Sequence, residues 1–179
     1  MLAVVVFGVA TASGFYPVAL VDGAPIFFKT WRRAEQAAIR FLNVQGSARG
    51  VGPVDFYAAE NADLLLGVKR DTLTFLIEDK ILQQEGETVV EDFDAVSAQK
   101  VAAVFQESGS LEQGAQLLYG LSREDFNELV LMPQARRDVL SEAFAAKGRD
   151  FEQWFREVRR NKNVRLLFVS FVWSGEVVQ

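Results

Sequence analysis

The 179-residue sequence contains no cysteine and no histidine. Without cysteine, the chain can form neither disulfides nor zinc–thiolate sites, and it has no thiol nucleophile. Without histidine, it lacks the commonest general base near neutral pH and the commonest metal ligand. Any catalysis would have to rest on carboxylates, lysines or serines. We therefore expect no cofactor and no metal site.

Basic charge is also scarce, since 19 lysines and arginines face 24 acidic residues for a net charge of -5. Proteins that bind nucleic acid normally carry a basic stripe, so we expect no nucleic-acid partner. One basic cluster, Arg156 to Lys162, falls at the end of an expected helix, where cations complement the helix dipole. Half of the residues are apolar, which is enough for a sizeable core in a single domain.

The sequence does not resemble an enzyme in its motifs. No serine lies in a Gly-x-Ser-x-Gly elbow. The glycine-rich stretch 46–53 is no phosphate loop, because no Gly-Lys-Ser/Thr follows it. The acidic run 91–94 lacks the Asp-x-Asp-x-Asp-Gly pattern of a calcium loop and suits the first turn of a helix. We expect a protein that is not an enzyme.

The N-terminus carries an uninterrupted apolar run from Leu2 to Ala10. It is shorter than the roughly 20 residues that cross a bilayer, and no basic region precedes it. Three interpretations compete: a membrane anchor whose upstream basic end is missing, a signal peptide lacking that end, and a buried strand or helix. We favour the anchor, and assign residues 1–16 to an anchor or signal remnant and 17–179 to one domain.

The stretch from Val68 to Gly86 predicts the helix around which the domain is organised. Leu73, Leu76, Ile77 and Ile81 recur at the spacing of one helical face. Phe75 and Leu82 lie on nearly the opposite face, so this helix should be covered on two sides. Gly86 would stop the helix, because glycine readily adopts the left-handed conformation after a last turn.

Further helices are predicted before and after this central one, and a small sheet at the chain ends. The helices begin at Thr30, Asp55, Leu111, Ser122 and Asp150, and Pro133 should kink the fourth near Leu131-Met132. Two extended arms flank the turn signal Asp22-Gly23, with Pro25 favouring an edge position. Val164 to Trp173 reads as a strand that should pair with Ala19 to Phe27. The expected fold is mainly α, a multi-helix chaperone-like domain with an antiparallel pairing of its two ends.

Several pieces of the chain resemble the N-terminal domain of the SurA/PrsA-type foldase chaperones. Val21 to Ile26 stands where that family has Val-Asn-Gly-x-x-Ile, and Leu76 to Gly86 is similar to its Leu-Ile-x-x-x-Leu-Leu-x-x-Glu helix. Thr88 to Asp94 matches the family's Thr-Val-Ser-x-Glu-Glu-Val start, except that Val90 replaces the serine. Leu121 to Phe144 is similar to its Leu-Ser-x-Glu-Glu-Phe helix. The resemblance spans about residues 18 to 163, through motifs that are individually loose.

The resemblance implies a membrane-tethered chaperone-like module on the extracytoplasmic face of the cell membrane, in the periplasm or at the cell surface. The family's isomerase activity belongs to a separate parvulin domain, which this chain lacks, so the implied function is holding unfolded apolar segments without catalysis. Expected partners are unfolded or partly folded polypeptides and the membrane, and a homodimer stays open. Candidate peptide-binding residues, chosen because they lie at helix ends or breaks, are Phe56, Tyr57, Phe105, Tyr119 and Met132. The alternative is a structural or assembly module that docks one specific envelope protein.

Overall fold

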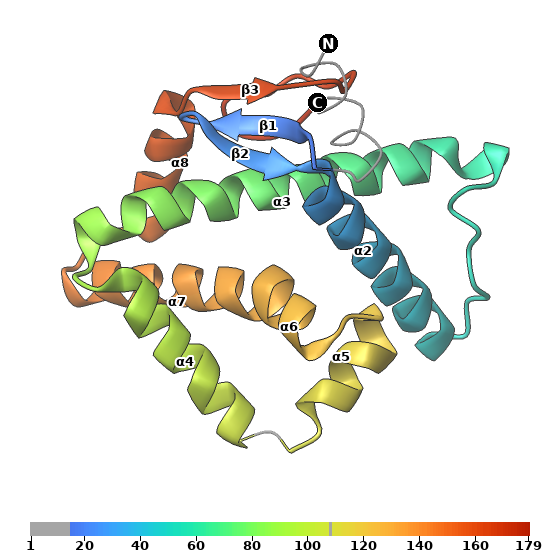
Figure 1. Ribbon diagram of the computed structural model, residues 1–179, viewed down its shortest axis with the longest axis horizontal. Helices are drawn as coiled ribbons and strands as arrows, with labels where there is room; N and C mark the ends of the chain where they lie inside the picture. Colours follow the sequence, from blue (N-terminus) through green and yellow to red (C-terminus); the bar gives the residue numbers. More distant parts are fainter. Residues whose placement is uncertain (1–14, 108) are drawn as a thin grey trace, which may run out of the picture.

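The structure, a computed structural model, describes residues 15–107 and 109–179 (Figure 1). The apolar run Leu2 to Ala10 lies outside the described residues, so the competing interpretations of it remain predictions. With 68% of the described residues in helices and one small antiparallel sheet, the fold is mainly α, as predicted.

The helices and strands follow one another in an order that places strands at both ends of the described chain. They are β1 (Pro17–Val21), β2 (Ala24–Phe27), α2 (Phe28–Ala48), η1 (Ala59–Asn61), α3 (Ala62–Val89), α4 (Phe93–Glu107), α5 (Leu111–Tyr119), α6 (Arg123–Phe126), η2 (Asn127–Leu131), α7 (Met132–Ala146), α8 (Phe151–Asn161) and β3 (Val164–Leu166). Of these, η1 is a 3-10 turn and η2 a π-helical turn.

The helix α3 is the central element, and it runs between the sheet on one side and α4 and α7 on the other (Figure 1). Leu73, Ile77 and Ile81 are fully buried, which confirms the predicted inner face. Leu82 is buried on the second face, but Phe75 is exposed. Helix α3 is therefore covered on two sides along only part of its length.

Gly86 does not stop α3, which continues to Val89, so that prediction was wrong. Gly86 is buried, and a Cβ on it would lie 2.0 Å from the ring of Phe93 at the start of α4. Because Gly86 has no side chain, α3 and α4 can approach each other closely at this point. The helical hydrogen bonds of α3 continue past Gly86 to Val89.

The sheet has the strand order β2-β1-β3, and both pairings are antiparallel. Asp22 and Gly23 both have positive φ and form the predicted hairpin turn between β1 and β2. Strand β1 also pairs with β3, with Val21 opposite Val164. The predicted pairing of the two chain ends is thereby confirmed, and Pro25 lies in an edge strand as expected.

The C-terminal strand is much shorter than the predicted Val164 to Trp173. It ends at Leu166, and Phe168 has a left-handed φ of 58° that breaks the extended conformation. The following tail folds back on itself, since Val172 and Gln179 exchange two backbone hydrogen bonds of 2.9 Å. The buried Val178 donates its N–H to Thr74 Oγ1 at 3.0 Å, which holds the tail on α3.

A cluster of charges ties the hairpin turn to α3 and to the end of α8. Lys162 Nζ lies 2.7 Å from an Asp22 carboxylate oxygen and 2.5 Å from one of Glu85. The other Asp22 oxygen accepts a hydrogen bond from the N–H of Asn163. The hydrogen bond from Lys162 is the main reason that the pKa of Asp22 lies below its usual value of 3.8. The basic end of α8 therefore has a structural use.

The helix from Ser122 to Ala146 is divided near Pro133, as predicted. Ser122 caps α6 by accepting a hydrogen bond from the N–H of Asp125. Because Pro133 has no N–H, it cannot continue the regular hydrogen-bond ladder, and the π-helical turn η2 lies immediately before it. Helix α6, which precedes this turn, contacts α5.

Candidate functional site

A groove of about 720 Å³ lies between α2 and α5. Figure 1 shows α5 on the side of the molecule away from the sheet. Its volume falls within the roughly 300–1,000 Å³ that is typical of ligand sites. The lining residues come from α2, from the loop before η1 and from α5: Gln36, Ile39, Arg40, Asn43, Val44, Ser47, Tyr57, Leu117, Tyr119 and Gly120. We call this hollow the α2–α5 groove.

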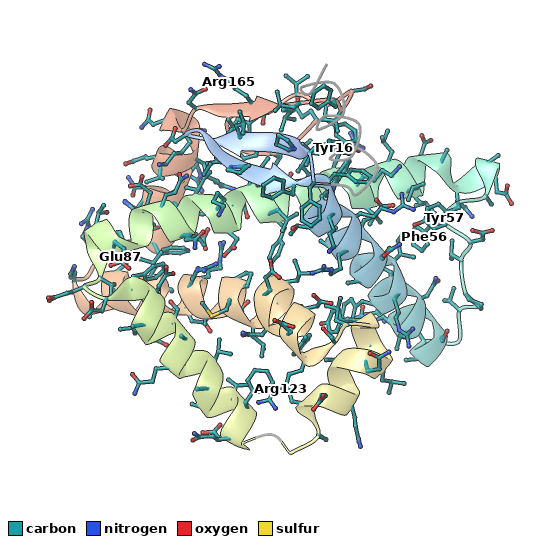
Figure 2. All side chains as sticks on the ribbon, in the orientation of Figure 1. Tyr16, Phe56, Tyr57, Glu87, Arg123 and Arg165 are labelled. Carbon is teal, nitrogen blue, oxygen red and sulfur yellow. The ribbon has the colours of Figure 1, made fainter. Side chains whose placement is uncertain are left out.

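One wall of the α2–α5 groove is built by the loop that follows α2. Asn43 fixes the loop with a pair of hydrogen bonds, because its Nδ2 donates to the carbonyl of Val54 at 3.1 Å and its Oδ1 accepts from the N–H of Val54 at 2.7 Å. Tyr57 follows this anchored stretch, and its ring is 56% exposed (Figure 2). Its hydroxyl donates to the buried carboxylate of Glu35 at 3.4 Å.

The opposite wall is α5, which docks on α2 through stacked rings. Tyr119 lies parallel to Phe41 with ring centroids 4.8 Å apart. Gly120 ends α5 with φ of 69°, and a Cβ there would come within 2.9 Å of Arg40 Cδ. Arg40 Nε donates to the carbonyl of Leu117 at 3.1 Å. The side chain of Leu117 is left 66% exposed at the rim.

The α2–α5 groove has a mixed lining of apolar and aromatic side chains, three uncharged polar side chains and one cation. Burial raises the pKa of the Tyr119 phenol. Burial also raises the pKa of Tyr57, and the charge of Glu35 raises it further. The Tyr57 hydroxyl already donates to Glu35, whereas the Tyr119 phenol stays protonated at neutral pH and can donate a hydrogen bond. Arg40 is the sole charged side chain among the lining residues of this described groove. Such a surface suits an apolar chain segment whose backbone carbonyls need donors.

Phe105 lines a different hollow, of about 600 Å³, between α4 and α6. The guanidinium of Arg123 lies over the Phe105 ring, 4.5 Å from its centroid. This cation–π contact covers part of the ring and joins α4 to α6 across the hollow. The hollow is lined further by Val101 and by polar side chains that include Asn127.

Met132 lines a third hollow, of about 430 Å³, between β2, α3, η2 and α7. This space holds an ion pair in which Arg136 Nη1 lies 3.0 and 2.9 Å from the two carboxylate oxygens of Asp79. Burial raises the pKa of Asp79 above its usual value, and outweighs the opposing effect of the Arg136 charge. The pair links α3 to α7, and we assign it a structural use.

The candidate residues from the sequence therefore do not form one site. Tyr57 and Tyr119 face the same groove, whereas Phe105 and Met132 belong to two others. Phe56, next to Tyr57, is buried and lines none of these three hollows. The most exposed apolar side chain of the α2–α5 groove, Leu117, was missed. The sequence did contain one signal: Leu117 and Leu118 are adjacent on a short helix, and only one of two adjacent residues can face the core.

A Ser-x-x-Lys spacing, found in some serine nucleophiles, occurs at Ser97 and Lys100. Ser97 is fully buried with its Oγ unpartnered, and Lys100 Nζ is paired with Glu142. Neither group is placed to attack a substrate. Across residues 15–107 and 109–179, no three carboxylates gather closely enough to hold a metal ion. Within the same residues, no helix combines the length and the apolar character that a bilayer span requires.

Comparisons with known proteins add no relative. No protein family, no curated protein and no solved structure matches the chain. The resemblance to the SurA/PrsA-type domain thus rests on the sequence motifs alone.

Proposed function

We propose that this chain is a membrane-tethered, extracytoplasmic, chaperone-like module that holds unfolded apolar segments in the α2–α5 groove without catalysis. The observation that carries the proposal is the groove itself, which combines apolar, aromatic and uncharged polar side chains with a single cation and is flanked by the exposed side chains of Leu117 and Tyr57. The motifs shared with the SurA/PrsA-type domain support the same function.

The make-up of the groove favours binding of many sequences over binding of one. Aliphatic and aromatic side chains such as Ile39, Leu117 and Tyr119 recognise apolar surface without a fixed direction. The side chains of Gln36, Asn43 and Ser47 can meet backbone groups, which every client shares. A site built in this way discriminates weakly between apolar segments, as a holdase requires.

The tether rests on the apolar run Leu2 to Ala10, which precedes the described fold. In this proposal the run anchors the chain at the extracytoplasmic face of the membrane. Clients would then be bound close to the membrane by the helical body.

The proposal is tested by light scattering from a reduced, unfolded model protein that aggregates on dilution. A molar excess of the full chain should slow the aggregation and lower its final extent. If scattering is unchanged at molar excess, the chain is not a holdase.

A second function, docking of one specific envelope protein, is favoured by the hollow at Phe105. The Phe105 ring packs against the guanidinium of Arg123, and this specific contact suits a defined partner better than a varied set of clients. Affinity capture from solubilised membranes separates the two. One stoichiometric partner would favour docking, and a broad set of unfolded clients would favour the chaperone-like function.

A further inference from the structure

Exposed aromatic rings gather where the N-terminal segment joins the described fold. Phe15 is 56% exposed, and Phe168, from the tail after β3, is 75% exposed. The ring of Tyr16 lies between the two segments, since the Phe168 ring meets it edge-on at 6.2 Å and Phe28 stacks on its other side at 5.0 Å. Figure 2 shows Tyr16 beside the sheet. We call Phe15, Tyr16 and Phe168 the aromatic patch.

The conformation of Phe168 is costly for the isolated domain. Its φ of 58° is left-handed, a conformation that is unfavourable for a residue with a side chain. The same conformation turns a large ring into the solvent, where its apolar surface gains nothing. Strain and exposure at one residue are explained together if the ring meets an apolar environment outside the domain.

The chain itself indicates which environment this is. The apolar run ends at Ala10, and only the residues Thr11 to Gly14 separate it from Phe15. Fully extended, that connection spans at most about 18 Å. A membrane into which the run inserts would therefore lie within reach of the aromatic patch. The amphipathic rings of tyrosines such as Tyr16 are typical of the bilayer interface. Lys29 Nζ lies 5.1 Å from the centroid of the Phe15 ring and adds a cation beside the patch.

We propose that the aromatic patch rests in the headgroup region of the membrane that the N-terminal run enters. This inference depends on the tether of the proposed function and adds to it the face on which the domain sits. Figure 1 shows the C-terminus and β3 on one side of the molecule and α5 on the far side. The α2–α5 groove, which α5 lines, consequently lies on the side away from the lipid.

The absence of cysteine makes this contact measurable in the full chain. Phe168→Cys introduces a single thiol, which is labelled with the environment-sensitive fluorophore NBD. The matched control is Leu117→Cys, labelled in the same way at a similarly exposed position on α5. The probe membrane is a vesicle of phosphatidylcholine. We expect the chain to float with the vesicles, with a blue shift and a severalfold rise in emission at position 168 and no change at 117.

The other outcomes are distinct. Flotation with no change of emission at position 168 overturns the aromatic patch and leaves the tether in place. An equal change at 168 and 117 overturns the orientation and therefore the inference. A chain that stays out of the floated fraction overturns the tether and the inference together. The aggregation assay in solution needs no membrane, so failure of the holdase function is recorded separately.

Discussion

Substitution of Gly86 by alanine tests the packing between α3 and α4, which holds one corner of the helical body. In α3 the glycine has ordinary helical geometry, so alanine suits the backbone and would by itself add up to about 1 kcal/mol of helix stability. The obstacle is steric. The new Cβ would lie 2.0, 2.1 and 2.6 Å from three atoms of the Phe93 ring.

The sign of the effect follows from how little Phe93 can move. Its side chain is fully buried, so relief of the overlap requires a shift of α4 or a strained rotamer. Overpacking of this kind costs about 1–3 kcal/mol and sometimes more. An overlap of more than 1 Å belongs at the upper end of that range, which exceeds the propensity gain. We expect Gly86→Ala to lower the free energy of unfolding by about 2 kcal/mol.

The matched control is Gly67→Ala in the same helix, where no atom lies within 4 Å of an added Cβ. There only the propensity gain applies, and we expect stabilisation of up to about 1 kcal/mol. Urea unfolding followed by circular dichroism measures both variants. Opposite signs would support the close approach of Phe93 to Gly86. Equal stabilisation in the two variants would refute it.

Two further predictions concern the chain ends. Deletion of residues 164–179 removes β3 and the buried Val178, so the whole domain should melt at a lower temperature than the full chain; an unchanged melting temperature would show that the tail is dispensable. Asp22→Asn removes a carboxylate whose pKa is lowered by Lys162 while keeping an acceptor for Asn163. A lowered pKa stabilises the fold above the unfolded value of 3.8, and this contribution disappears as pH falls through the folded pKa. The stability difference between wild type and Asp22→Asn should thus shrink on acidification, and urea unfolding at a series of pH values would show a constant difference if the reasoning fails.

The central helix could be predicted because its signal is local and periodic. Leu73, Ile77 and Ile81 repeat at helical spacing, and burial follows the repeat. The structural role of Gly86 could not be predicted from such a periodic pattern. A glycine near the end of a helix serves either as a stop or as a point of close approach, and the choice depends on Phe93, which belongs to the next helix.

The pairing of the two ends was predictable because isolated extended segments need backbone partners. The length of the last strand was not. The β-branched and aromatic residues after Val164 favour a strand. The strand is interrupted because Phe168 has a left-handed backbone conformation, which a phenylalanine side chain does not predict. The tail beyond it is held by contacts with Thr74, distant in sequence.

The candidate site was predictable only in part, since the α2–α5 groove is assembled from segments far apart in the chain. Tyr57 and Tyr119 were predicted from their positions near helix ends, and both line the α2–α5 groove. Phe56 satisfies the same criterion, but neighbours in a turn point to different sides, and it is buried. Leu117 has no sequence feature that distinguishes a rim residue from a core leucine except its leucine neighbour.

The central claim is that unfolded chains are held in the α2–α5 groove. Replacement of a leucine by glutamine keeps a good helix former and removes apolar contact surface. Leu117→Gln makes this change at the rim of the groove. Leu64→Gln makes the same change on α3, at a leucine that is more than half exposed and lines none of the three hollows. Thermal unfolding of both variants is the control that shows whether each is folded.

The decisive measurement is the aggregation of the reduced model protein with equal amounts of wild type, Leu117→Gln and Leu64→Gln. The account predicts that Leu117→Gln needs several times more protein for the same suppression, and that Leu64→Gln matches the wild type. Equal suppression by the two variants would contradict the account, because the groove would then have no part in holding the client.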